Sequence, residues 1–142
     1  MCAHRRQQFA EAVNSFGVAI ALAPTCAECY YNRALAHAAL GDNVRALNDY
    51  DRALTLAPRL AAAELNRGVL HYQEGQYSLA LADLERALRD GAQPAAAHYN
   101  LALVHLALRE ETAARRHLEQ VLADNSAHTD ARALLERLLR QK

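Results

Sequence analysis

The sequence predicts an all-α protein in which pairs of helices stack into a right-handed solenoid. Three observations predict this class. The chain is rich in Ala and Leu and 52% hydrophobic, whereas its 5 Gly and 3 Pro provide few turns for a sheet-rich fold. Apolar residues recur at spacings of three and four, as in amphipathic helices. The sequence also repeats with a period of 34 residues, and units of that length must stack to bury a common core.

The repeat becomes visible when residues 27–60, 61–94 and 95–128 are aligned, which requires no insertion. The segment YNRAL then aligns with LNRGV and YNLAL, and RALNDYDRAL aligns with LALADLERAL. Residues 1–26 form a truncated first copy that holds only the second helix of a pair, and residues 129–142 form a capping helix. We therefore predict one domain over residues 1–142, containing about three and a half helix pairs.

Each repeat is expected to hold two helices separated by a glycine turn. The predicted ranges, in chain order, are 7–22, 28–40, 44–56, 62–74, 77–89, 96–108, 111–123 and 129–142. Gly41 and Gly75 are expected to end first helices, because glycine readily adopts the left-handed conformation. Pro58 and Pro94 lie at joints between repeats, where proline is expected to halt the preceding helix. Thr129 is the expected N-cap of the last helix.

The alternation of small and bulky positions resembles that of the tetratricopeptide repeat (TPR) family, whose unit is a helix–turn–helix of 34 residues. The matching positions are Ala34, Gly68 and Ala102; Ala46, Ala80 and Ala114; Phe16, Tyr50, Leu84 and Leu118; and Pro24 and Pro58. The sequence departs from the family pattern where Glu64 and His98 replace an aromatic residue, and where Val121 replaces a small one. The resemblance covers nearly the whole chain.

In proteins similar to this one, the first helices line a concave groove, so the resemblance implies that an asparagine of each repeat lies there. These are Asn32, Asn66 and Asn100. A carboxamide both donates and accepts hydrogen bonds, so it can hold the backbone of an extended peptide. The neighbouring groove residues are expected to be Tyr31, Leu35, Leu65, Val69, Tyr72, Gln73, Tyr99 and Leu103. Alternatively, each asparagine bonds within its own repeat or to water.

Composition narrows the function further. With 16 basic and 16 acidic residues, the chain lacks the positive charge expected of a nucleic-acid binder or an electrostatic membrane anchor. We find no catalytic motif, and we predict no enzyme activity and no cofactor. The groove positions also lack the lysines that clamp the carboxylates of chaperone tails. We interpret the chain as a non-catalytic adaptor or scaffold that binds a peptide or partner protein, in the cytoplasm.

Three histidines recur at the same period, namely His37, His71 and His105. They could form a zinc site, but packed helices stand roughly 10 Å apart. Zinc requires its ligands to converge to about 2 Å from one ion. We therefore favour half-buried imidazoles that contribute to packing.

Cys26 and Cys29 form a C-x-x-C motif at a helix start, where the helix can lower the pKa of a thiol. Redox activity, or a metal site completed by Cys2 and His4, is conceivable. Three cysteines are an odd number and too few for a disulfide scaffold, so we expect a reducing compartment. The favoured interpretation is that both cysteines are small packing residues.

Charged residues also repeat in register. Arg33 precedes Asp49, and Arg67 precedes Asp83, by the same interval; in the next repeat both partners change together. We predict an ion pair between the two helices of each of these two repeats.

The first helix carries an apolar stripe of Phe9, Val13, Phe16 and Ile20 that lacks the usual partner helix. Apolar stripes of this size seldom remain exposed. As an alternative function, the chain is a structural segment of a larger TPR protein that associates through this face. The partner at this face could also be a second copy of the chain.

Overall fold

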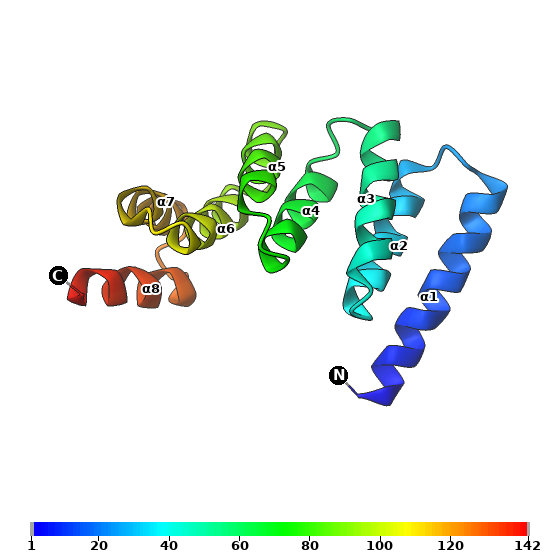
Figure 1. Ribbon diagram of the computed structural model, residues 1–142, viewed down its shortest axis with the longest axis horizontal. Coiled ribbons are helices and arrows are strands. Elements are labelled where there is room, and N and C mark those ends of the chain that lie inside the picture. Colours follow the sequence, from blue (N-terminus) through cyan, green and yellow to red (C-terminus); the bar gives the residue numbers. More distant parts are fainter. Residues whose placement is uncertain (1, 142) are drawn as a thin grey trace. The chain divides into compact units, whose positions relative to one another are not determined.

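The computed structural model describes residues 2–141, and all regular structure within that range is helical. The helices in chain order are α1 (Ala3–Leu22), α2 (Ala27–Ala39), α3 (Asn43–Leu56), α4 (Ala61–Gln73), α5 (Tyr77–Arg89), α6 (Pro94–Ala107), α7 (Glu111–Asp124) and α8 (Thr129–Arg140) (Figure 1). The predicted all-α class and each predicted helix are thus confirmed. Within this part of the chain, no helix combines the length and apolar character needed to cross a membrane.

The chain divides into two compact units, and the boundary between them along the sequence falls within α4. The first runs to Ala63, and the second begins at Glu64. The first unit therefore contains α1, α2 and α3, whereas most of α4 and all later helices belong to the second.

In the first unit, α2 packs against both α1 and α3. Ala34 on α2 and Ala46 and Ala53 on α3 are fully buried. A methyl side chain allows two helix backbones to approach closely, and larger side chains fill the space beside the contact. Tyr50 is one of these larger residues: it is buried, and its ring centre lies 6.2 Å from that of Tyr31.

The second unit contains two apolar clusters. The first joins buried Ala80 and Leu84 of α5 to Leu101 and Val104 of α6. The second joins residues of α6, α7 and α8, including Ala102, Leu118 and Leu138. Because α8 contributes to this core, it is anchored to the same body as α6 and α7.

The turn inside each repeat requires a residue with a positive φ angle. Gly41 and Gly75 take this place in two repeats, with φ of 81° and 79°, as predicted. In the third repeat the equivalent residue is Arg109, with φ of 63°. This conformation crowds the Cβ atom of any residue other than glycine, so Arg109 is strained.

Two predicted helix ends are wrong in detail. Pro94 is the first residue of α6 and does not halt the helix before it. Proline suits this position, because the first helical N–H needs no partner and the fixed φ angle is already helical. The last helix is capped by His128 and not by Thr129, since the His128 Nδ1 accepts the Ala131 N–H at 3.1 Å.

Candidate functional site

The three repeated asparagines lie on the first helix of each pair. Asn32 is on α2, Asn66 on α4 and Asn100 on α6, and all three are half-buried. On α2, Tyr31 is half-buried and Leu35 is exposed. These residues of α2 form the part of the predicted groove that belongs to the first unit.

In the second unit, the predicted groove residues of α4 also contribute to the core. Leu65, Val69 and Tyr72 are half-buried and pack against the cluster formed by α5 and α6. Gln73, at the end of α4, is exposed. The apolar side chains of α4 are therefore held in place by the core while part of each surface remains accessible.

Asn100 has a partner inside its own helix. Its Nδ2 donates to the Ala96 carbonyl at 2.9 Å. Asn100 therefore bonds within its own repeat, which is the alternative to peptide binding given above for the asparagines. A carboxamide has two N–H donors and an oxygen with two lone pairs, so the bond uses only one of its hydrogen-bonding positions.

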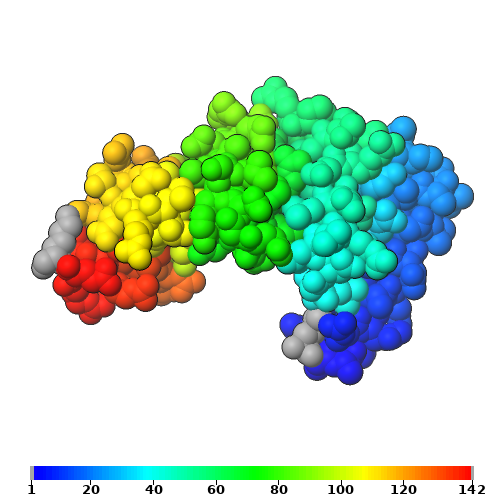
Figure 2. All heavy atoms as spheres, viewed as in Figure 1, coloured from blue at the N-terminus to red at the C-terminus, as the bar shows by residue number. Residues whose placement is uncertain are grey.

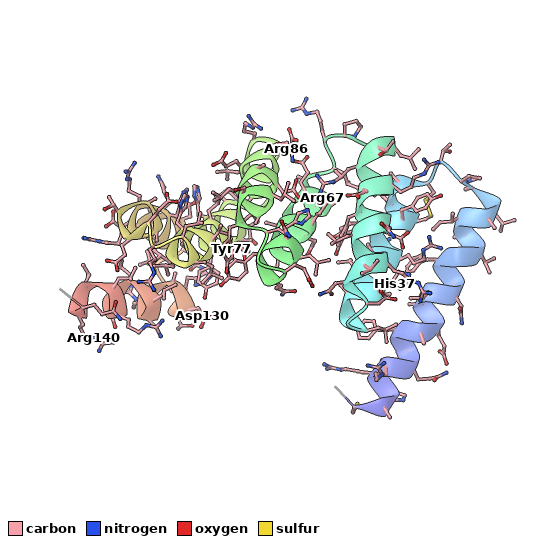
Figure 3. The ribbon with its side chains drawn as sticks, viewed as in Figure 1. His37, Arg67, Tyr77, Arg86, Asp130 and Arg140 are labelled. Carbon is pink, nitrogen blue, oxygen red and sulfur yellow. A yellow bond between two sulfur atoms is a disulfide. The ribbon has the colours of Figure 1, made fainter. Side chains whose placement is uncertain are left out.

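Two predicted groove residues of α6 line a hollow against α8. Tyr99 and Leu103 form one wall, and the other comes from α8. The hollow measures about 450 Å³, and the α8 residues lining it are Asp130, Ala133, Leu134, Arg137 and Arg140. Figure 2 shows α8, in red, against the yellow and orange atoms of α6 and α7, and Figure 3 marks Asp130 and Arg140 near opposite ends of α8. The lining combines apolar side chains with two arginines and one aspartate, so its charge is net positive. Such a lining suits an apolar side chain next to a carboxylate.

The contribution of α8 to the hollow was not predicted. The sequence indicated only a capping helix, whereas the exposed Arg137 and Arg140 of this helix line the hollow. The available signal was spacing: Asp130, Leu134 and Arg137 follow each other at intervals of three and four, so they share one face of a helix.

Tyr99, which lines this hollow, contacts the ring of His128. Its ring centre lies 5.1 Å from that of His128. Burial raises the pKa of Tyr99 above its ordinary value, and the negative charge of Asp130 raises it further. Tyr99 therefore remains a neutral phenol that can donate a hydrogen bond at physiological pH.

Both predicted ion pairs are confirmed, and both are bidentate. The Arg33 Nε and Nη2 donate to the two Asp49 oxygens at 2.8 Å each. The Arg67 Nε and Nη2 donate to Asp83 at 2.8 and 2.7 Å. Asp83 also accepts from Arg86 Nη2 at 2.7 Å; Arg67 and Arg86 are labelled in Figure 3. Because the Asp83 side chain is only 2% exposed, removing its partners would leave a buried charge.

Each of the three periodic histidines lies close to a side chain on the second helix of its own repeat. The His37 Nε2 lies 3.6 Å from Asp49, and the His71 Nε2 lies 3.7 Å from Asp83. In the third repeat the aspartate is replaced by His117, and the His105 ring stacks on the His117 ring with centres 5.3 Å apart.

His117 also faces His98 across α6 and α7. Their Nδ1 atoms are 2.9 Å apart while their ring centres are 5.2 Å apart, so the two nitrogens meet nearly head-on. This is the geometry of one imidazole donating to the other, and it leaves no room for an ion between them. Burial, followed by the neighbouring His98 and His105, lowers the His117 pKa to about 4, so this ring is neutral at pH 7. Among residues 2–141, no three His, Cys, Asp or Glu side chains are grouped to hold a metal.

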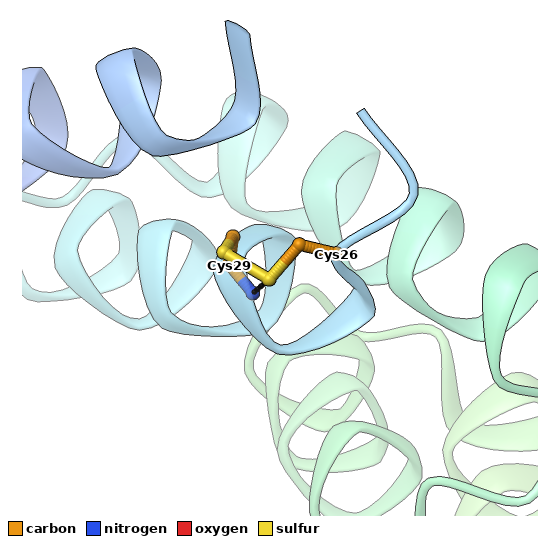
Figure 4. Close-up of a disulfide and its surroundings, with 2 residues drawn as sticks. All are labelled: Cys26 and Cys29. Carbon is orange, nitrogen blue, oxygen red and sulfur yellow. Dashed lines mark hydrogen bonds between the residues drawn. A yellow bond between two sulfur atoms is a disulfide. The ribbon is translucent and has the colours of Figure 1, made fainter. Parts of the chain in front are cut away.

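Cys26 and Cys29 are joined by a disulfide bond (Figure 4). The interpretation of both as unpaired packing residues is therefore wrong. Cys26 is the N-cap of α2, and Cys29 lies in its first turn, so the helix start brings their Cα atoms to 5.2 Å. The Cys26 Sγ accepts the Cys29 N–H at 3.2 Å, while Cys2 is an exposed free thiol.

The apolar stripe of α1 is not left uncovered. Phe9, Val13, Phe16 and Ile20 are each half-buried, because α1 packs along α2. The expectation that no helix covers this face is thus wrong. The strongly exposed apolar residues of α1 are Val18 and Leu22, which lie outside that stripe.

Comparison with known proteins places these features in context. Two tetratricopeptide repeat models match the chain, at residues 27–60 and at residues 65–128. The chain resembles YrrB, a TPR protein described as having an unusual peptide-binding site, with 28% identity and a TM-score of 0.82 over 89% of this chain and 66% of YrrB. It resembles PilF of Pseudomonas aeruginosa with 23% identity and a TM-score of 0.89 over 96% of this chain and 62% of PilF.

A third similar structure is the first TPR of Spaghetti (RPAP3) bound to an HSP90 peptide. It has 16% identity and a TM-score of 0.75 over 81% of this chain and 94% of that chain. The predicted α-solenoid fold class is thereby confirmed. This chain spans just under two thirds of the length of YrrB and of PilF. No curated protein matches the sequence significantly.

Proposed function

Because the chain belongs to the tetratricopeptide repeat family, we propose that it is a non-catalytic protein-interaction module that binds an extended peptide segment of a partner protein. One observation carries the proposal: Tyr99 and Leu103 line an accessible hollow with α8. Two of the predicted groove residues thus adjoin a space that a ligand side chain could fill. The peptide-binding site described for YrrB supports the same type of function.

The chemistry of the hollow defines the ligand more closely. Leu103 and Leu134 provide an apolar surface, and Arg137 and Arg140 provide cationic groups. We propose a peptide in which an apolar side chain enters the hollow and a neighbouring carboxylate meets the α8 arginines. The carboxamides of Asn66 and Asn100, both in the second unit, would bind its backbone, independently of the identity of its side chains.

The first test is selection of a random peptide library on the purified protein, followed by measurement of Kd for the selected peptides. The double variant Asn66→Ala/Asn100→Ala should weaken binding about 10- to 100-fold, since two hydrogen bonds are lost. Arg137→Ala should weaken it about fivefold and reduce its sensitivity to salt.

Arg89→Ala is the matched control, because Arg89 is exposed on α5 and does not line the hollow. It should leave Kd unchanged. Selection of no peptide, or equal affinity of all three variants and the wild type, would contradict the proposal.

A further inference from the structure

The Cys26–Cys29 bond does not join separate parts of the fold. It links two residues of one helical turn at a sequence separation of 3. A disulfide stabilises a protein mainly by restricting its unfolded chain, and the effect grows with the length of the loop that is closed. A loop this short restricts the chain little. The bond is therefore poorly suited to serve as a structural staple.

Its surroundings are better suited to reversible chemistry. Cys26 caps α2, and its Sγ already accepts a backbone N–H of the first turn. After reduction, the same N–H and the positive end of the helix dipole would stabilise a thiolate at Cys26. The carboxylate of Glu28, exposed in the same turn, opposes this effect only through solvent.

The bond also lies beside solvent-exposed chain. Both cysteines are half-buried, and residues 21–25, which lead into α2, are exposed. A thiolate leaves most readily from a disulfide when its own pKa is low. Cys26 is thus the better leaving group, and Cys29 Sγ is the sulfur that an incoming thiolate would attack.

We propose that Cys26 and Cys29 form a redox-active couple that exchanges reversibly with thiols and disulfides of other molecules. In the reductive direction, a thiolate attacks Cys29 Sγ, the S–S bond breaks, and Cys26 leaves as a thiolate. A second thiol then attacks the mixed disulfide, which releases the substrate disulfide and leaves both cysteines reduced. Two electrons and two protons pass to the protein, and the reverse sequence returns them to a substrate disulfide.

The test is titration with mixtures of reduced and oxidised glutathione, using the full chain with Cys2→Ser to remove the other thiol. Alkylation and intact-mass spectrometry then count the free thiols. We expect millimolar reduced glutathione to open the bond and oxidised glutathione to close it again. A bond that stays closed throughout, or cysteines that never pair, would overturn the proposal.

Single-cysteine variants test the assignment of the two sulfurs. With Cys2→Ser and Cys29→Ser, Cys26 should react with iodoacetamide at pH 7 about tenfold faster than Cys29 does with Cys2→Ser and Cys26→Ser. The reason is that the helix start and the accepted backbone N–H stabilise the Cys26 thiolate. Circular dichroism of the reduced protein should match that of the oxidised one. Equal reactivity, or loss of helical signal on reduction, would contradict the proposed roles.

Discussion

Arg109 adopts a backbone conformation that the other two repeats assign to glycine. A φ of 63° costs a residue with a Cβ atom roughly 1–2 kcal/mol of folding free energy. Glycine avoids this strain, but its unfolded chain has more conformational entropy, which cancels part of the gain. We predict that Arg109→Gly stabilises the protein by about 0.5–1 kcal/mol, measured by urea unfolding. Arg109→Ala retains the strain and is the control. Equal stabilisation by both variants would show that the gain does not come from the backbone.

Glu64 is a buried carboxyl group that titrates near neutral pH. Burial raises its pKa to about 7, and the adjacent Asp90 adds to the shift. A carboxyl with a raised pKa binds its proton more tightly in the folded state. Stability should therefore fall as pH rises from about 4.5 to about 7, by on the order of 2–3 kcal/mol.

The variant Glu64→Gln should remove this pH dependence, as measured by unfolding at several pH values. Glu85→Gln, on the exposed surface of α5, should leave it intact. If the wild type is equally stable across this range, the shift assigned to Glu64 is wrong.

At the level of single residues, prediction from sequence succeeded where periodicity fixes the geometry. Arg33 and Asp49 could be paired because a constant interval places them on facing helices. The same reasoning could not find the head-on contact of His98 with His117, because these positions hold other residues in the other repeats. Nor could it pair Cys26 with Cys29, since a C-x-x-C motif is compatible with several states.

Gly68 on α4 packs closely against α5, where no space remains for a side chain. A Cβ atom on Gly68 would lie 3.0 Å from Leu84 Cγ and 3.1 Å from Asp83 Cβ. Neither neighbour can retreat, because Leu84 is fully buried and Asp83 is held by two arginines. We predict that Gly68→Ala destabilises the protein by about 1–3 kcal/mol, although alanine favours a helix.

Gly17→Ala on α1 provides the matched control in thermal unfolding. Its new Cβ atom would lie 3.8 Å from Arg33 Nη1, which is an ordinary contact. This variant should stabilise the protein by about 0.5–1 kcal/mol through helix propensity. A stabilising Gly68→Ala would mean that the two helices can separate at little cost.

Helix positions were predictable to within a few residues, because glycine turns interrupt a regular apolar pattern. The predicted range 77–89 coincides with α5. The exceptions arose where one residue serves two roles: Pro94 can end or begin a helix, and His128 can replace Thr129 as a cap. Such choices depend on local backbone geometry, which the sequence pattern does not determine.

For the whole molecule, sequence revealed the family but not the complete binding surface. Repeat positions indicated Tyr99 and Leu103, whose neighbours on α8 lie outside the repeats. The cationic side of the hollow arises only when α8 packs onto α6 and α7, which is a tertiary contact. The proposed preference for an apolar residue beside a carboxylate therefore rests on the structure of the second unit.

The central claim, peptide binding at α6 and α8, is tested most directly by NMR. The tightest library peptide would be titrated into ¹⁵N-labelled protein, and shifts of backbone and side-chain amides followed. The account predicts the largest changes at Asn100, Leu103 and Arg137. Changes confined to α1 or to the second helices α3, α5 and α7 would contradict it.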